Sequence, residues 1–205
     1  MLKRAYISNG KATILHWKIK YRAYLVNNHI VFTFIGRDQP GLVRKLSATV
    51  AEHGGNWLES RMSRLGGQFA GAVRVAIVAE RQPALIEALA RLGAEGLQVV
   101  CQAADDGERD SGNRVLLQVI GNDRPGIVLE VSRALASQNI NVIDMQTALT
   151  SAAMTAEPLF EARVEVQIPE GFDRDALEQA LDQIADQLSV EIDISPLTAA
   201  PEPLP

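Results

Sequence analysis

The sequence is short of cysteine and of long apolar runs, and both shortages exclude classes of protein. The single cysteine, Cys101, cannot form an internal disulfide, and no Cys/His cluster has the spacing of a zinc site. No apolar run reaches the roughly 18 residues that a membrane-spanning helix needs. We therefore expect a cytoplasmic protein that needs neither membrane, metal nor cofactor.

Catalytic motifs are missing as well. The chain has no G-x-S-x-G nucleophile elbow, no phosphate-binding loop and no dinucleotide-binding G-x-G-x-x-G. Of its three histidines, two fall within residues 1–30, and His53 falls at a predicted helix end, where a cation favours the helix dipole. Cys101 is expected to be a small core residue. The sequence therefore favours a protein that is not an enzyme.

Acidic residues are absent from residues 1–30, which hold six lysines and arginines. The remaining 175 residues carry 14 bases against 25 acids, so their net charge is −11. A body this acidic repels phosphate backbones, which argues against direct nucleic-acid binding. Residues 1–30 are interpreted as a loosely attached extension, a basic docking arm, or an extra strand or helix. The Pro-rich residues 195–205 are predicted to be extended and mobile.

The central part of the chain repeats itself at an offset of 85 residues. Residues 31–60 and 116–145 share nine identities in thirty positions, against about two expected from average composition. The most similar segment is GRDQPGLV at 36–43, which recurs as GNDRPGIV at 121–128. This pattern predicts two copies of one domain, 31–103 and 114–194, joined by a polar linker at 104–113.

Each copy predicts the same series of elements. A strand is followed by a helix that opens at Asp-x-Pro-Gly. Its apolar face is Val43/Leu46/Val50 in copy one and Val128/Val131/Leu135 in copy two. The helix ends near residues 53–55 in copy one and near 138–139 in copy two. Two strands, a second helix and a last strand follow. The predicted strands are 31–36, 56–65, 73–77 and 97–103 in copy one and 114–121, 141–150, 160–168 and 188–194 in copy two, and the second helices are 82–94 and 173–187.

The order β-α-β-β-α-β predicts an α+β fold of the ferredoxin-like type. Each domain then has a four-stranded antiparallel sheet with both helices on one face. The other sheet face is left to water or to a partner. In copy two, Glu161, Arg163 and Glu165 are expected on that wet face. In copy one, the same face is alanine-rich, which favours contact with another subunit.

The Asp-x-Pro-Gly segment joins the end of a strand to the start of a helix. The first turn of a helix presents unpaired N–H groups and a partial positive charge, which suit a carboxylate. Asp38 and Asp123 lie where they could accept the ammonium of the same amino acid, or equally where they could form the turn itself. The same segment also makes sense as a turn and helix start with no ligand.

The element order together with D-x-P-G-[LI]-[LIV] resembles the ACT domain family of small-molecule-binding regulatory modules. Two such domains in tandem over residues 31–194 resemble the subgroup of glycine cleavage system transcriptional repressors. The resemblance implies amino-acid binding at domain interfaces and association into a homo-oligomer. It implies control of a DNA-binding transcriptional activator through protein contact, with glycine or a similar amino acid as effector.

The resemblance also implies the binding residues. In copy one they are Arg37, Asp38, Gln39, Pro40, Gly41, Leu42 and Asn56, and in copy two they are Asn122, Asp123, Arg124, Pro125, Gly126, Ile127 and Asn141. Asn56 and Asn141 can also be explained as turn residues that follow the first helix. Two other functions stay open: control of a metabolic enzyme in trans, and a purely structural dimerisation module.

Overall fold

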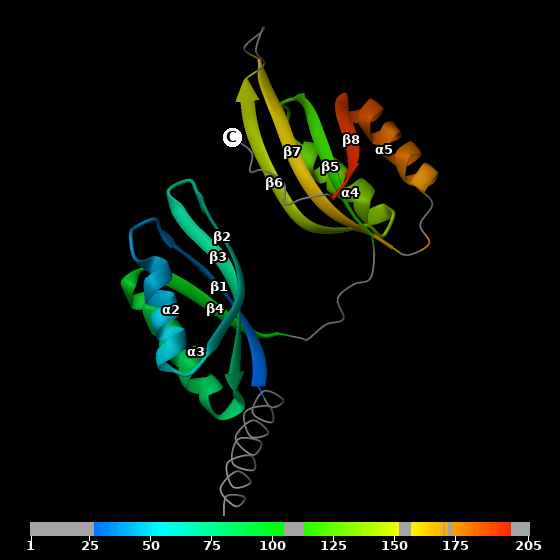
Figure 1. Cartoon of the computed structure of the whole chain (residues 1–205). Coiled ribbons are helices and arrows are strands. Elements are labelled where there is room, and N and C mark those ends of the chain that lie inside the picture. Colours follow the sequence, from blue (N-terminus) through cyan, green and yellow to red (C-terminus); the bar gives the residue numbers. More distant parts are fainter. Residues whose placement is uncertain (1–26, 105–112, 152–156, 170, 172–173, 198–205) are drawn as a thin grey trace, which may run out of the picture. The chain divides into compact units, whose positions relative to one another are not determined.

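The computed structural model describes residues 27–104, 113–151, 157–169, 171 and 174–197. The chain divides into two compact units, residues 1–107 and 108–205. We call them unit one and unit two and describe each by itself (Figure 1). Of the predicted extension at 1–30, the predicted linker at 104–113 and the predicted tail at 195–205, residues 1–26, 105–112 and 198–205 lie outside the described ranges.

Unit one is a four-stranded antiparallel sheet with two α-helices. Its strands lie in the order β2-β3-β1-β4. Short 3₁₀ turns precede and follow the second helix. The elements are β1 (Asn27–Arg37), α2 (Leu42–Glu52), β2 (Asn56–Leu65), β3 (Gln68–Val78), η1 (Ala79–Arg81), α3 (Gln82–Arg91), η2 (Leu92–Glu95) and β4 (Leu97–Ala103).

Unit two repeats this architecture, with strands in the order β6-β7-β5-β8. Both units are therefore βαββαβ folds of the α+β class, as the sequence predicts. The elements are β5 (Asn113–Asn122), α4 (Ile127–Ser137), β6 (Asn141–Ser151), β7 (Pro158–Ile168), α5 (Arg174–Leu188) and β8 (Val190–Pro196).

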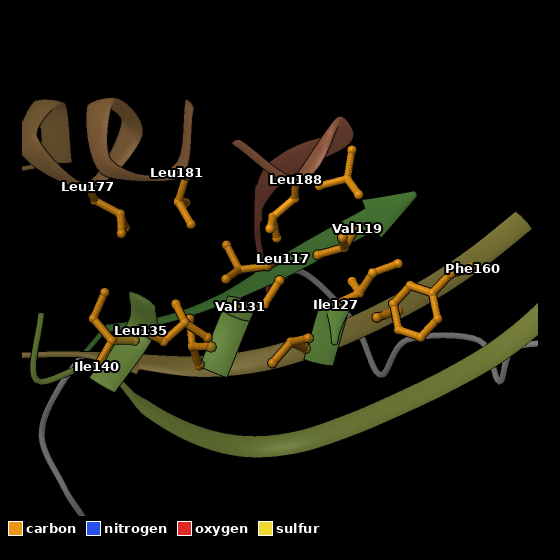
Figure 2. Packing of buried hydrophobic residues seen from close by; sticks show 14 residues of the cluster. Leu117, Val119, Ile127, Val131, Leu135, Ile140, Phe160, Leu177, Leu181 and Leu188 are labelled. Atoms are coloured by element: carbon orange, nitrogen blue, oxygen red, sulfur yellow. The ribbon is translucent and has the colours of Figure 1, made fainter. Parts of the chain in front are cut away.

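The hydrophobic core of each unit lies between the sheet and its two helices. In unit two, Figure 2 shows Leu117 and Val119 of the central strand β5 facing Val131 of α4, with Leu181 of α5 in the same cluster. Unit one has a separate core built the same way, in which Phe32 stacks edge-to-face on Trp57 with ring centroids 6.1 Å apart. Each unit therefore buries its own apolar surface.

The buried face of the first helix differs by one position from the prediction. Leu42, Leu46 and Val50 are buried, whereas Val43 is 44% exposed. Unit two shows the same pattern, since Ile127, Val131 and Leu135 are buried and Val128 is 42% exposed. The predicted and the observed faces share Leu46 and Val50 in unit one and Val131 and Leu135 in unit two. Each helix buries the face whose apolar residues are four positions apart, so Leu42 and Ile127 take the places of Val43 and Val128.

Several strands extend beyond their predicted ends. β1 begins at Asn27, because residues 27–30 pair with β3 and the Ile30 side chain is fully buried. β5 includes Asn113, which pairs with Ile168, and β8 continues to Pro196, which pairs with Val115. In each case the additional residues complete a ladder with a neighbouring strand, which composition alone does not reveal.

Leu46→Ala tests whether the two cores are separate. Leu46 is fully buried in the core of unit one, so its truncation should lower stability by about 3 kcal/mol. Hydrogen exchange measured by mass spectrometry should then show faster exchange in β1, β3 and β4 and unchanged exchange in β5 and β7. The matched variant Leu135→Ala should give the opposite pattern, and equal loss in both units would contradict separate cores.

Candidate functional site

The bends between the first strand and the first helix have the same backbone geometry in both units. Gly41 and Gly126 are the N-cap residues of α2 and α4, with φ angles of 94° and 101°. This left-handed region favours glycine. The Asp38 N–H donates to the Gly67 carbonyl and the Asp123 N–H to the Pro158 carbonyl, both at 3.0 Å. Each bend is thereby tied to the neighbouring strand hairpin.

The first glycine of the repeated segment also serves the fold. A Cβ added at Gly36 would lie 2.9 Å from Leu97 Cδ1, and one at Gly121 would lie 2.5 Å from Val190 Cγ1. These contacts are too close for a side chain, so the last strand of each unit can pack there only against glycine. The glycines therefore need no ligand to explain them.

The proline and the last residue of the predicted binding segment lie in different surroundings. Pro40 and Pro125 precede the N-cap and are not in the first helical turn. The Leu42 and Ile127 side chains are buried in the cores, with 5% and 2% exposure. Only the backbone of Leu42 and Ile127 can therefore face a ligand. Arg37, Gln39, Pro40 and Pro125 are exposed.

In unit one the start of α2 is open. Among the residues that the structure describes, no side chain caps the helix and no atom lies within 4 Å of a Cβ built at Gly41, and the first turn of α2 has no acidic residue. A depression of about 230 Å³ lies beside it, lined by residues that include Asp38, Gln39 and Phe69. The Asp38 carboxylate is 3.4 Å from the exposed Arg64 guanidinium. The bend thus offers backbone N–H donors beside a carboxylate.

In unit two the Arg124 side chain crosses the bend. Its Nε and Nη2 donate to the carbonyl of Leu188, the last residue of α5, at 3.3 and 3.1 Å, and Nη2 also donates to Glu130 Oε2 at 3.2 Å. A cavity of about 430 Å³ opens there, lined by Asn122, Arg124, Glu130, Gln187, Leu188 and Ser189. Sequence reasoning missed Glu130, although its place in the first turn of α4 is a local signal, and it missed the residues at the end of α5, because only the strand order brings those to the bend.

The two asparagines lie far from the bends within their own units. Asn56 of β2 and His29 of β1 both pair with Ala76 of β3, so Asn56 lies at the level of His29 in the sheet. The bend, by contrast, follows Arg37 at the other end of β1. The eight residue-to-residue steps from His29 to Arg37 span about 26 Å of strand. Asn141 pairs with Gln167, and Gln167 pairs in turn with Arg114, which lies at the other end of β5 from Asn122. One unit alone therefore does not bring the asparagines and the bend together.

The other chemically reactive side chains have structural explanations. Cys101 packs against the core of unit one, and burial raises the pKa of its thiol. His53 caps the end of α2, with Nδ1 2.8 Å from the Thr49 carbonyl oxygen. Glu165 lies on the open sheet face as predicted, but it is only 7% exposed and is paired with Arg114 at 3.1 Å, so it is not wet.

Across the described residues, no three His, Cys, Asp or Glu side chains are grouped as metal ligands. None of the helices in those ranges has the length and apolar character of a membrane span.

A family model described as the ACT domain matches residues 28–102 and again residues 113–195. The chain belongs to the ACT domain family. Its βαββαβ units, each with a D-x-P-G bend at the start of the first helix, are two tandem ACT domains.

Individual proteins are also similar to this chain. UPF0237 proteins of Methanosarcina mazei and Methanosarcina acetivorans are 33% and 32% identical over 84 residues, covering 41% of this chain and 86% of each relative. A crystal structure of an unknown protein from Galdieria sulphuraria has a TM-score of 0.70 and 28% identity, covering 83% of this chain and 98% of that one. A protein assigned provisionally as a glycine cleavage system transcriptional repressor has the same fold, with a TM-score of 0.64, 18% identity and coverage of 83% and 97%.

Gly41→Ala tests whether the left-handed bend is a constraint of the fold. Alanine at φ 94° should cost about 1–2 kcal/mol of stability, measured from urea midpoints. Gly93→Ala is the matched control, because a Cβ there meets no atom within 4 Å and no left-handed φ is present. Equal stability of the two variants would contradict the strain at Gly41.

Proposed function

We propose that this tandem ACT protein is a non-catalytic regulator that binds a small amino acid, such as glycine, at its D-x-P-G bends. The observation that carries the proposal is the uncapped start of α2 beside the Asp38 carboxylate. The helix N–H groups would receive the ligand carboxylate, and Asp38 would accept the ligand ammonium. An α-amino acid has its ammonium and carboxylate groups bonded to the same carbon, so one ligand suits both partners.

The proposed site is completed by a second ACT domain. The amides of Asn56 and Asn141 lie at the ends of the sheets opposite the bends of their own units. An asparagine can therefore contact a ligand at a bend only if the asparagine belongs to another ACT domain. This requirement supports the prediction of a homo-oligomer whose assembly responds to the ligand.

The proposed partner is a protein, namely a DNA-binding transcriptional activator of glycine cleavage genes, in the cytoplasm. The fold shared with a protein assigned to glycine cleavage repression supports this proposal. The net charge of −11 for residues 31–205 argues against contact with nucleic acid. Regulation of this kind requires ligand affinity to differ between the partner-bound and free states, typically by about 1–3 kcal/mol.

Isothermal titration of the full chain with glycine, alanine and serine tests the sensing step. We expect saturable binding of at least one of them. Asp38→Asn should weaken binding at unit one by about tenfold or more, because a hydrogen bond to a charged group contributes about 1.5–3 kcal/mol. Glu52→Gln removes an exposed carboxylate from the far end of α2 and should leave affinity unchanged. Absence of binding for all three amino acids at 10 mM, or equal affinity of Asp38→Asn and wild type, would contradict the proposal.

A further inference from the structure

The strand β4 lies at one edge of the sheet of unit one. In the part of the chain that the structure describes, β1 is the only strand that pairs with β4, so no second strand takes up the backbone groups of its outer edge. The sequence of β4 is LQVVCQA, which contains no charged residue and no proline. An edge strand of this composition is a ready template for pairing with another strand.

The other three sheet edges carry features that oppose such pairing. β2 and β6 each contain a register shift, within residues 57–59 and 142–144, which interrupts the regular spacing of the strand. β8, the counterpart of β4 in unit two, carries the exposed carboxylates of Glu191 and Asp193 and ends at Pro196. Among the four sheet edges that the structure describes, β4 alone has no register shift, charge or proline.

The middle residue of β4 shows the difference between the copies most directly. Val100 pairs with Thr33 and Asp193 pairs with Gln118, and residues 33 and 118 are equivalent in the 85-residue repeat. Val100 therefore stands where unit two has Asp193. The Val100 side chain is 59% exposed, so a second strand beside β4 would bury apolar surface there. At the same place in β8, two carboxylates would face each other, which is unfavourable.

The sequence of β4 is complementary to itself in the antiparallel direction. The register that pairs all seven of its residues places Val100 opposite its own counterpart in a second chain. Gln98 then lies opposite Gln102, and each amide can both donate and accept a hydrogen bond. Val99 lies opposite Cys101, and both side chains are only partly buried against the core of unit one. Every pair in this register therefore joins side chains of the same kind.

We infer that β4 pairs antiparallel with β4 of a second copy of this chain, with the two-fold axis at Val100. The two four-stranded sheets then form one sheet of eight strands. A second copy suits this edge better than an extended peptide of another protein, because an identical strand matches β4 in length and in the kind of side chain at each position. Pairing along β4 needs no bound ligand. The inference therefore names a surface for the homo-oligomer and stands apart from the proposed amino-acid binding.

Site-specific cross-linking of the full chain tests this interface. Cys101→Ala removes the one cysteine of the sequence, and Val100→Cys or Asp193→Cys is then added as the only thiol. Side chains directly opposite each other in an antiparallel pair have Cβ atoms about 4.5–5.5 Å apart. Bismaleimidoethane should therefore convert the Val100→Cys protein into a covalent dimer. Asp193→Cys is the matched control at the equivalent exposed position of β8 and should stay monomeric on a denaturing gel.

Sedimentation equilibrium of the full chain without cross-linker measures the strength of the association. Val100→Lys places two ammonium groups opposite each other and should raise the dissociation constant of the dimer by about tenfold or more. Asp193→Lys should leave that constant unchanged. Both positions are exposed, so both variants should fold, and thermal unfolding checks this.

Three results would overturn the inference and leave the proposed amino-acid binding untouched. The first is a wild-type chain that sediments as a monomer at submillimolar concentration. The second is a dimer whose dissociation constant is the same in Val100→Lys and Asp193→Lys, which would indicate association through another surface. The third is a Val100→Cys protein that cross-links no better than the Asp193→Cys protein.

Discussion

The left-handed bend between the first strand and the first helix is the constraint on which the rest of each unit depends. It joins an inner strand of the sheet to the first helix through an N-cap glycine in the left-handed region. The backbone bonds from Asp38 to Gly67 and from Asp123 to Pro158 fix it against a hairpin. The glycine at the end of the strand lets the last strand pack closely, which brings the end of the second helix to the same place.

Duplication has kept this backbone and changed the charges around it. In unit one, Lys45 of α2 forms a salt bridge with Glu95 of η2, and the bend itself stays open. In unit two, Arg124 of the bend donates instead to the backbone carbonyl of Leu188 at the end of α5. Its other partner is the Glu130 carboxylate in the first turn of α4. Within the described residues, neither first helix has a side-chain cap, and unit two adds a charge pair beside the start of its helix.

The repeated octet allowed the fold and the place of both bends to be predicted, because Asp-x-Pro-Gly and the apolar periodicity are local signals. Which apolar series of the first helix is buried depends on how the helix sits on the sheet, so Val43 was assigned to the core wrongly. The contact from Arg124 to Leu188 joins residues 64 positions apart and follows only from the strand order. The distance from Asn56 to the bend likewise needed the register of β1, β2 and β3.

The central claim is that a small amino acid lies against these bends. It is tested most directly by a crystal structure of the full chain grown with a saturating concentration of whichever of glycine, alanine or serine gives the largest heat on titration. The account predicts ligand density within hydrogen-bond distance of the backbone N–H groups that follow Gly41. Bends without ligand density, or density bound only at a place remote from both of them, would contradict it.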